Sequence, residues 1–166
     1  MDILGELSMK YRGKRYDNGK WVYGSLIVLD DECQYIVPRF EGASTAPVYQ
    51  IIRCTMEEID PATIGRYTGL NEKLNRTGKE IYEDDLVEVK TMEIKYQSRW
   101  VKGVVKFLDG CFEVEFCEPI YDVLLKTYRT RLYLKYFVAN NAIKVLGNIH
   151  DNPELLEIKH VSKNSD

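Results

Sequence analysis

The chain has 166 residues, of which 45% are hydrophobic and 30% are charged, close to the average of globular proteins. This composition excludes a disordered or fibrous chain, and the length suits one domain or two small ones. The formal net charge of -3 provides no global positive field, so nucleic acid is disfavoured as a partner of the whole surface.

The first sixty residues are expected to contain β-strands and tight turns. Two strands, over 10–16 and 21–29, flank Asp17-Asn18-Gly19-Lys20, and Asn-Gly favours a hairpin turn. Short strands are predicted over 34–37 and 48–55, on either side of a loop over 38–47. Asp60-Pro61 then starts a helical turn that Gly65 keeps short.

A second hairpin is predicted further along the chain. After a strand over 86–94, strands over 100–107 and 111–116 flank Leu108-Asp109-Gly110. Period-two alternation places Phe112, Val114 and Phe116 on one face of the later strand. A strand over 143–149 is expected to close the fold.

The segment 121–138 fits two structures. Leu125, Tyr128, Leu132 and Tyr136 have helical spacing, whereas alternate residues from Thr130 to Val138 fit a strand equally well. We predict a helix there, ending at Asn140-Asn141, where a left-handed residue is easily accommodated.

These elements predict a mainly β, or β-rich α+β, protein. Its antiparallel hairpins are expected to form a small curved sheet or an SH3-like barrel, with one short helix. We expect an N-terminal β-hairpin lobe over 1–60, a C-terminal barrel-like lobe over 61–158 and a flexible tail over 159–166. A single compact domain over 1–158 is the alternative.

The sequence favours a chain that is not secreted and whose cysteines are reduced. Residues 1–9 lack the basic start and apolar middle of a secretory signal, and no apolar stretch is long enough to cross a membrane. Cys33, Cys54, Cys111 and Cys117 form no Cys-x-x-Cys pair and lack zinc-ligand spacing with the histidines. We therefore expect thiols, with no metal and no cofactor.

An acidic run could perform acid–base chemistry or hold a hard cation; it consists of Glu80, Glu83, Asp84, Asp85 and Glu88. Its spacing matches neither a calcium loop nor a zinc-peptidase helix, so a solvated turn is the favoured interpretation. His150-Asp151 could form an oriented base but has no candidate nucleophile. No catalytic residue is predicted.

Basic residues alternate with aromatic residues in the first hairpin, as in proteins that bind single-stranded nucleic acid. The candidate binding surface consists of Arg12, Arg15, Trp21, Tyr23, Arg66 and Tyr67. A second patch of this kind contains Lys126, Arg129, Arg131 and Lys135 with Tyr128, Tyr133 and Tyr136. The nineteen aromatic residues, twelve of them Tyr, suit a protein interface equally well.

Four separated blocks of the sequence closely resemble the YopX-like family of phage and prophage proteins. They are Arg12-Gly13-Lys14-Arg15 with 18–24, then 64–70 followed by 78–87, then 103–112, and finally 145–156. Two features depart from the family pattern: the connection over 71–77 is long, and Asp84 stands where the family usually has Gly. Aspartate tolerates a left-handed conformation better than most residues.

The resemblance implies a phage or prophage origin, a bacterial cytoplasm, a β-rich fold and no established activity. The leading hypothesis is an accessory protein that acts by binding a protein partner or by homo-oligomeric assembly. The alternative is single-stranded nucleic-acid binding through the first hairpin. A metal-dependent enzyme using the acidic run is the least favoured hypothesis, and no membrane association is expected.

Overall fold

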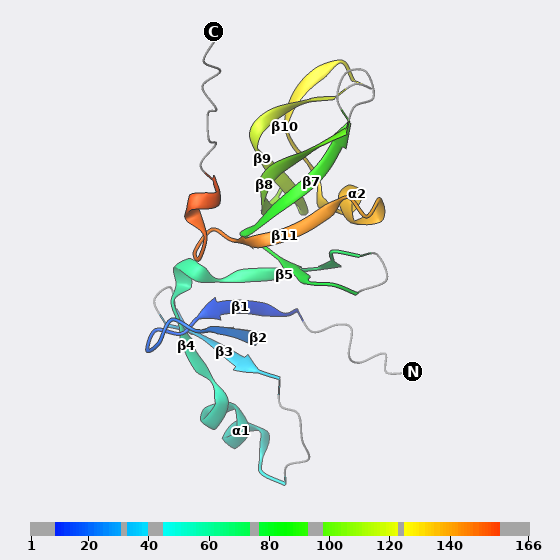
Figure 1. Ribbon diagram of the computed structural model, residues 1–166. Coiled ribbons are helices and arrows are strands. Elements are labelled where there is room, and N and C mark those ends of the chain that lie inside the picture. Colours follow the sequence, from blue (N-terminus) through cyan, green and yellow to red (C-terminus); the bar gives the residue numbers. More distant parts are fainter. Residues whose placement is uncertain are drawn as a thin grey trace. The chain divides into compact units, whose positions relative to one another are not determined.

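The computed structural model describes residues 9–30, 33–39, 45–73, 77–92, 98–122 and 125–156. The chain divides into two compact units, Met1–Tyr67 and Thr68–Asp166. Antiparallel strands make up 57% of the described residues, which confirms the mainly β class (Figure 1). The sheets are curved and, within the described ranges, do not close into a barrel. The predicted tail over 159–166 lies outside the described residues.

The first unit contains the predicted hairpin. Strands β1 (Tyr11–Lys14) and β2 (Trp21–Val28) pair in antiparallel register, and Gly19 has a φ of 67° in the turn between them. The sheet continues to β3 (Gln34–Pro38) and β4 (Glu57–Ile59) on one side of the hairpin. On its other side, β1 pairs with the beginning of β5 (Gly65–Asn71).

The sheet of the first unit curls until β4 meets the end of β1. Arg15 forms a single antiparallel bridge with Ile59, and the Asp60 N–H donates to the Lys14 carbonyl at 2.8 Å. Ile36 and Ile59 are fully buried inside the curl. A Cβ on Gly13 would lie 2.1 Å from Cγ2 of Ile59, so this close approach requires glycine.

The strand predicted over 48–55 is wrong, because this segment is the helix α1 (Val48–Thr55). Its half-buried residues Ile51, Ile52 and Thr55 follow the three- and four-residue spacing of a helix face. The β-branched side chains that suggested a strand therefore line one side of a helix. The predicted turn after Asp60 is confirmed as the 3-10 turn η2 (Pro61–Thr63), in which the Asp60 carboxylate accepts from the Ala62 N–H.

The second unit contains the end of β5, which neighbours β6 (Glu80–Tyr82), and a five-stranded antiparallel sheet. The order of the sheet is β10-β9-β8-β7-β11. Its members are β7 (Asp85–Met92), β8 (Ser98–Leu108), β9 (Cys111–Asp122), β10 (Thr127–Tyr133) and β11 (Ile143–Asn148). The hairpin of β8 and β9 and the late strand β11 are confirmed as predicted.

The helix predicted over 121–138 is wrong for most of its length. The segment begins as the end of β9, continues as β10 and becomes helical only at α2 (Leu134–Ala139). Thr127, Tyr128 and Thr130 favour an extended backbone, and pairing with β9 reinforces this preference. The expected left-handed residue is present after the helix, since Asn141 has a φ of 49°.

The core of the second unit lies between one face of this sheet and α2. Leu134, Phe137 and Val138 of the helix are buried against the inner face of the strands. The ring of Phe137 meets the ring of Phe116 edge to face, with centroids 6.1 Å apart. The last described element is the 3-10 turn η4 (Pro153–Leu156).

Candidate functional site

The first unit carries a basic–aromatic face, which we define as Lys10, Arg12, Lys14, Trp21, Tyr23 and Tyr67. Arg12 lies opposite Tyr23 and Lys14 opposite Trp21 in the register of β1 and β2, so these side chains share one side of the sheet. Tyr67 lies two residues beyond Gly65, which pairs with Arg12, and therefore shares this side.

Arg15 and Arg66 of the candidate surface lie on the other side of the sheet. Arg66 pairs with Tyr11, which is adjacent in sequence to Arg12 and therefore points the opposite way. Arg15 forms ion pairs with Asp17 at 2.7 Å and with Glu57 at 3.1 Å. The hydrogen bonds that Arg15 donates to the Asp17 carboxylate raise the pKa of Arg15 above its ordinary value. The structure therefore brings together four of the six predicted residues.

Cations already occupy the rings of the basic–aromatic face. The guanidinium carbon of Arg12 lies 4.9 Å from the centre of the Trp21 ring, and Lys14 Nζ lies 5.4 Å from it. Lys10 Nζ lies 5.8 Å from the Tyr23 ring and 5.9 Å from the Tyr67 ring. Arg12 is only 6% exposed. A base stacking on these rings would have to displace cation–π contacts worth about 0.5–2 kcal/mol each.

The acidic run is dispersed in the structure. Glu80 accepts from the Tyr82 hydroxyl at 2.7 Å, and buried Asp85 accepts from the Tyr82 N–H at 2.8 Å. Glu88 lies in β7 between Lys102 of β8 and Lys144 of β11. Among the described residues, no group of three or more His, Cys, Asp or Glu side chains is placed to hold a metal ion. These carboxylates instead make separate contacts, each within its own turn or strand.

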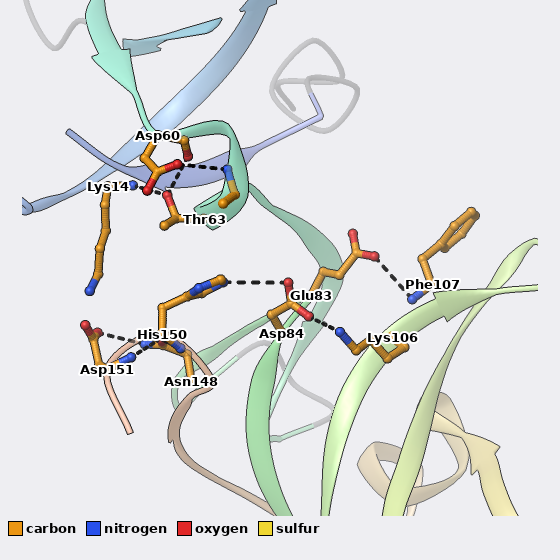
Figure 2. A network of polar contacts seen from close by, with 11 residues as sticks. Lys14, Asp60, Thr63, Glu83, Asp84, Lys106, Phe107, Asn148, His150 and Asp151 are labelled. Atoms are coloured by element: carbon orange, nitrogen blue, oxygen red, sulfur yellow. Dashed lines mark hydrogen bonds and ion pairs between the residues drawn. The ribbon is translucent and has the colours of Figure 1, made fainter. Parts of the chain in front are cut away.

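Asp84 joins three segments of the second unit. Its carboxylate forms an ion pair with Lys106 of β8, and its Oδ2 lies 3.8 Å from Nε2 of His150, as Figure 2 shows. Its backbone N–H donates to Val105 and its carbonyl accepts from Ile149. Its φ of 66° is left-handed, a conformation that aspartate tolerates better than most residues.

The loop containing His150 is organised by Asn148. The Asn148 side-chain oxygen accepts the N–H groups of His150 and Asp151 at 3.0 and 2.9 Å, while its amide donates to the Asp151 carboxylate. Asp151 therefore bonds to Asn148, and the carboxylate that faces the imidazole is Asp84 (Figure 2).

The four cysteines are thiols, and none forms a disulfide. Cys111 and Cys117 both lie on β9 and are half-buried. Burial raises the pKa of both thiols above their ordinary value, with a further contribution from Glu113 at Cys111. A raised pKa disfavours the nucleophilic thiolate, so neither thiol is an activated nucleophile.

The chain matches the model of the YopX protein family over residues 10–157. The chain belongs to the YopX family. Comparisons with curated proteins and with solved structures give no match. Within the described residues, no helix has the length and apolar character that crossing a membrane requires.

The YopX-like sequence blocks specify turns and close packing in the described residues. A Cβ on Gly24 would lie 2.0 Å from the Val37 carbonyl oxygen, and one on Gly147 would lie 2.0 Å from the Asn152 side chain. The blocks over 78–87, 103–112 and 145–156 also supply Asp84 and its partners. In the second unit, the residues of these blocks therefore hold turns and strands together.

The two edges of the second unit's sheet differ. At β11, the Val145 N–H donates to the Glu72 carboxylate at 2.7 Å, and the Val145 carbonyl accepts from Lys79 Nζ at 3.3 Å. These side chains take the place of a neighbouring strand. At β10, the sheet order ends, and the described residues show no such contact to the backbone of Thr127–Tyr133 on the side away from β9.

The β10 edge, defined here as Thr127–Tyr133 with Tyr136 of α2, carries large exposed side chains. Tyr128 is 70% exposed, Tyr133 60% and Tyr136 59%. These residues belong to the second basic–aromatic patch of the sequence, which was not included in the predicted surface. Pattern analysis could have found the edge from the segment 125–139, which has four basic and no acidic residues.

Proposed function

We propose that this YopX-family chain is a phage or prophage accessory protein that works in the bacterial cytoplasm by binding another protein. The observation that carries the proposal is the open β10 edge, which combines unpaired strand backbone with exposed tyrosines. An open edge is a template for an added strand, and natural sheets usually block such edges. Tyrosine supplies contact area together with a polar tip.

Affinity capture from bacterial host extract tests this proposal. The immobilised chain is compared with a Tyr128→Ala/Tyr133→Ala variant after nuclease treatment of the extract. We expect proteins captured by the parent chain to be lost from the variant. Tyr49→Ala is the matched control, because Tyr49 is 68% exposed in the first unit. Capture that the double variant leaves unchanged would contradict a role for this edge.

Homo-oligomeric assembly is the form of this function in which the partner is a second copy. Sedimentation velocity over a wide concentration range tests it directly. Self-association predicts a sedimentation coefficient that rises with concentration, whereas a constant monomer value contradicts it.

A second candidate function is single-stranded nucleic-acid binding, and the clustering of Lys10, Arg12 and Lys14 on three rings favours it. It predicts binding to a fluorescent oligonucleotide that weakens steeply with salt and on Trp21→Ala or Arg12→Ala. The occupied rings and the burial of Arg12 make it second to protein binding. Absence of binding at low salt would exclude it.

A further inference from the structure

We infer that the β10 edge takes an extended, acidic strand of a partner protein, added beside Thr127–Tyr133. This inference rests on the proposed function and assigns the chemistry of its partner. It has three parts: an available backbone, a charge that selects the partner, and side chains that supply contact area.

The backbone of β10 is suited to strand addition. Its ladder with β9 uses one side of the strand, and five of its seven residues are exposed. The register with β9 shifts between Arg129 and Arg131, so Thr130 has no paired residue in β9. In the same unit, β11 has its edge occupied by Glu72 and Lys79. Within the described part of this sheet, β10 is therefore the edge that can accept main-chain hydrogen bonds from a partner.

The charge of the edge favours an acidic partner. Lys126, Arg129, Arg131 and Lys135 lie within 125–139, a segment without Asp or Glu. Arg129 contacts Asp122 at 2.9 Å, and Arg131 contacts Asp109 at 3.3 Å and Glu113 at 3.4 Å. The pair of Arg131 with Asp109 is well exposed and worth about 0–1 kcal/mol, so Arg131 can leave Asp109 for a carboxylate of an added strand at little cost. The side chains of Asp122 and Glu113 are only 17% and 12% exposed, so an added strand gains most where its carboxylates join these contacts without replacing them.

The same charges disfavour a second copy of β10 as the added strand. Antiparallel self-pairing about Thr130 would place Arg129 of each copy opposite Arg131 of the other. Like charges directly opposite each other on paired strands are destabilising. An acidic strand replaces this repulsion with attraction and leaves Tyr128 and Tyr133 to contact its side chains.

The test uses a fluorescent peptide with the length of β10, seven residues, in which glutamates alternate with valines and threonines. Its matched control has lysine in place of each glutamate. Binding to the full chain is followed by fluorescence anisotropy at low and at physiological salt. The key variant is Thr130→Pro, which removes the backbone N–H of the one β10 residue that the register with β9 leaves unpaired.

We expect the acidic peptide to bind, to weaken with salt and to exceed the basic peptide in affinity by about tenfold or more, equivalent to about 1.4 kcal/mol. Thr130→Pro and an Arg129→Gln/Arg131→Gln double variant should each weaken binding by a similar factor. Tyr49→Ala should bind like the parent chain. Circular dichroism and a melting curve establish that each variant is folded, and the double Gln variant provides the test if proline unfolds β10.

Three results would overturn the inference: equal affinity for the acidic and basic peptides, no binding of the acidic peptide at low salt, or unchanged binding by both the proline and the double Gln variants. If captured host proteins are still lost from the Tyr128→Ala/Tyr133→Ala variant, the proposed function stands and only the acidic-strand assignment fails. If capture is also unaffected, both fail.

Discussion

The strands β10 and β11 are the two edges of one sheet, and they differ in their contacts with side chains. At β11, Glu72 and Lys79 bind the N–H and the carbonyl of a single residue, Val145, as a neighbouring strand would. At β10, five of the seven residues are exposed, and four of the seven side chains are basic or aromatic. Side chains that bind the backbone of an edge strand prevent it from pairing with another strand. Among the described residues of this sheet, β11 has such contacts and β10 does not.

The basic–aromatic face of the first unit sharpens this contrast. Both surfaces combine cations with rings, but Arg12 and Lys14 lie over Trp21, whereas Tyr128 packs edge to face against Tyr121 and remains 70% exposed. Rings under intramolecular cations contribute mainly to the stability of the sheet. Exposed rings on an edge strand are available to a partner. Similar compositions therefore support different roles.

The largest expected effect is on the free energy of unfolding, which should differ between a core variant and a variant of the β10 edge. Phe137→Ala removes a fully buried ring between α2 and the sheet and should lower the free energy of unfolding by about 3–5 kcal/mol. Tyr136→Ala, one residue earlier and 59% exposed, should change it by less than about 0.5 kcal/mol. Urea unfolding measures both. Equal losses would contradict the assignment of Phe137 to the core and Tyr136 to the surface.

Glu72→Ala tests the protection of β11. The variant leaves the Val145 N–H without its acceptor, and a backbone group left unpaired costs about 1–3 kcal/mol. We also expect more self-association at high concentration, since a second sheet edge becomes available for pairing. Thermal melting and light scattering give the two readouts.

Glu154→Ala is the matched control for Glu72→Ala, because Glu154 is an exposed carboxylate in the same unit. Its melting temperature and light scattering should equal those of the parent chain. If Glu72→Ala behaves like this control, the carboxylate does not protect the β11 edge.

Much of this fold follows from local sequence signals. Asn18-Gly19 and Asp109-Gly110 mark their turns because Gly19, Asp109 and Gly110 adopt positive φ values that few other residue types accept. Alternation in β9 identifies its inner face, and Asp84 supplies the left-handed residue that its turn requires. Signals of this kind act within a few residues and need no knowledge of the tertiary structure.

The wrong predictions concern segments whose local signals conflict. The residues of α1 combine β-branched side chains with helical spacing, and β10 combines helical spacing with tyrosine and threonine. Pairing with β9 decides the second case, but a single sequence does not reveal which strand will be a neighbour. For the same reason, the opposite placement of Arg12 and Arg66 required the register of β1 with β5, and the protection of β11 required contacts between residues 72 and 145.

Asp84 offers a further test of what holds the β11 side of the sheet, since its carbonyl accepts the Ile149 N–H just beyond β11. Asp84→Ala should lower stability by about 1–2 kcal/mol, because alanine is strained at a φ of 66° and lacks the ion pair with Lys106. Asp84→Gly loses the ion pair but adopts this φ without strain, so its loss should be under about 1 kcal/mol. Equal losses measured by urea unfolding would show that the ion pair, and not the backbone conformation, sets the choice of aspartate.

The smallest expected effect concerns stability at the β10 edge. Arg131→Gln removes contacts with Asp109 and Glu113 at 3.3 and 3.4 Å, and Arg131 and Asp109 are both well exposed. The exposed pair with Asp109 contributes about 0–1 kcal/mol, so its loss alone should barely change the melting temperature at physiological salt. The Glu113 side chain is only 12% exposed, so loss of that contact accounts for the larger part of any decrease. A loss above about 2 kcal/mol would mean that Arg131 is committed to its intramolecular carboxylates. The guanidinium could then not turn to an added strand. The positive charge of Arg131 would in that case not distinguish the β10 edge from the β11 edge as a binding site.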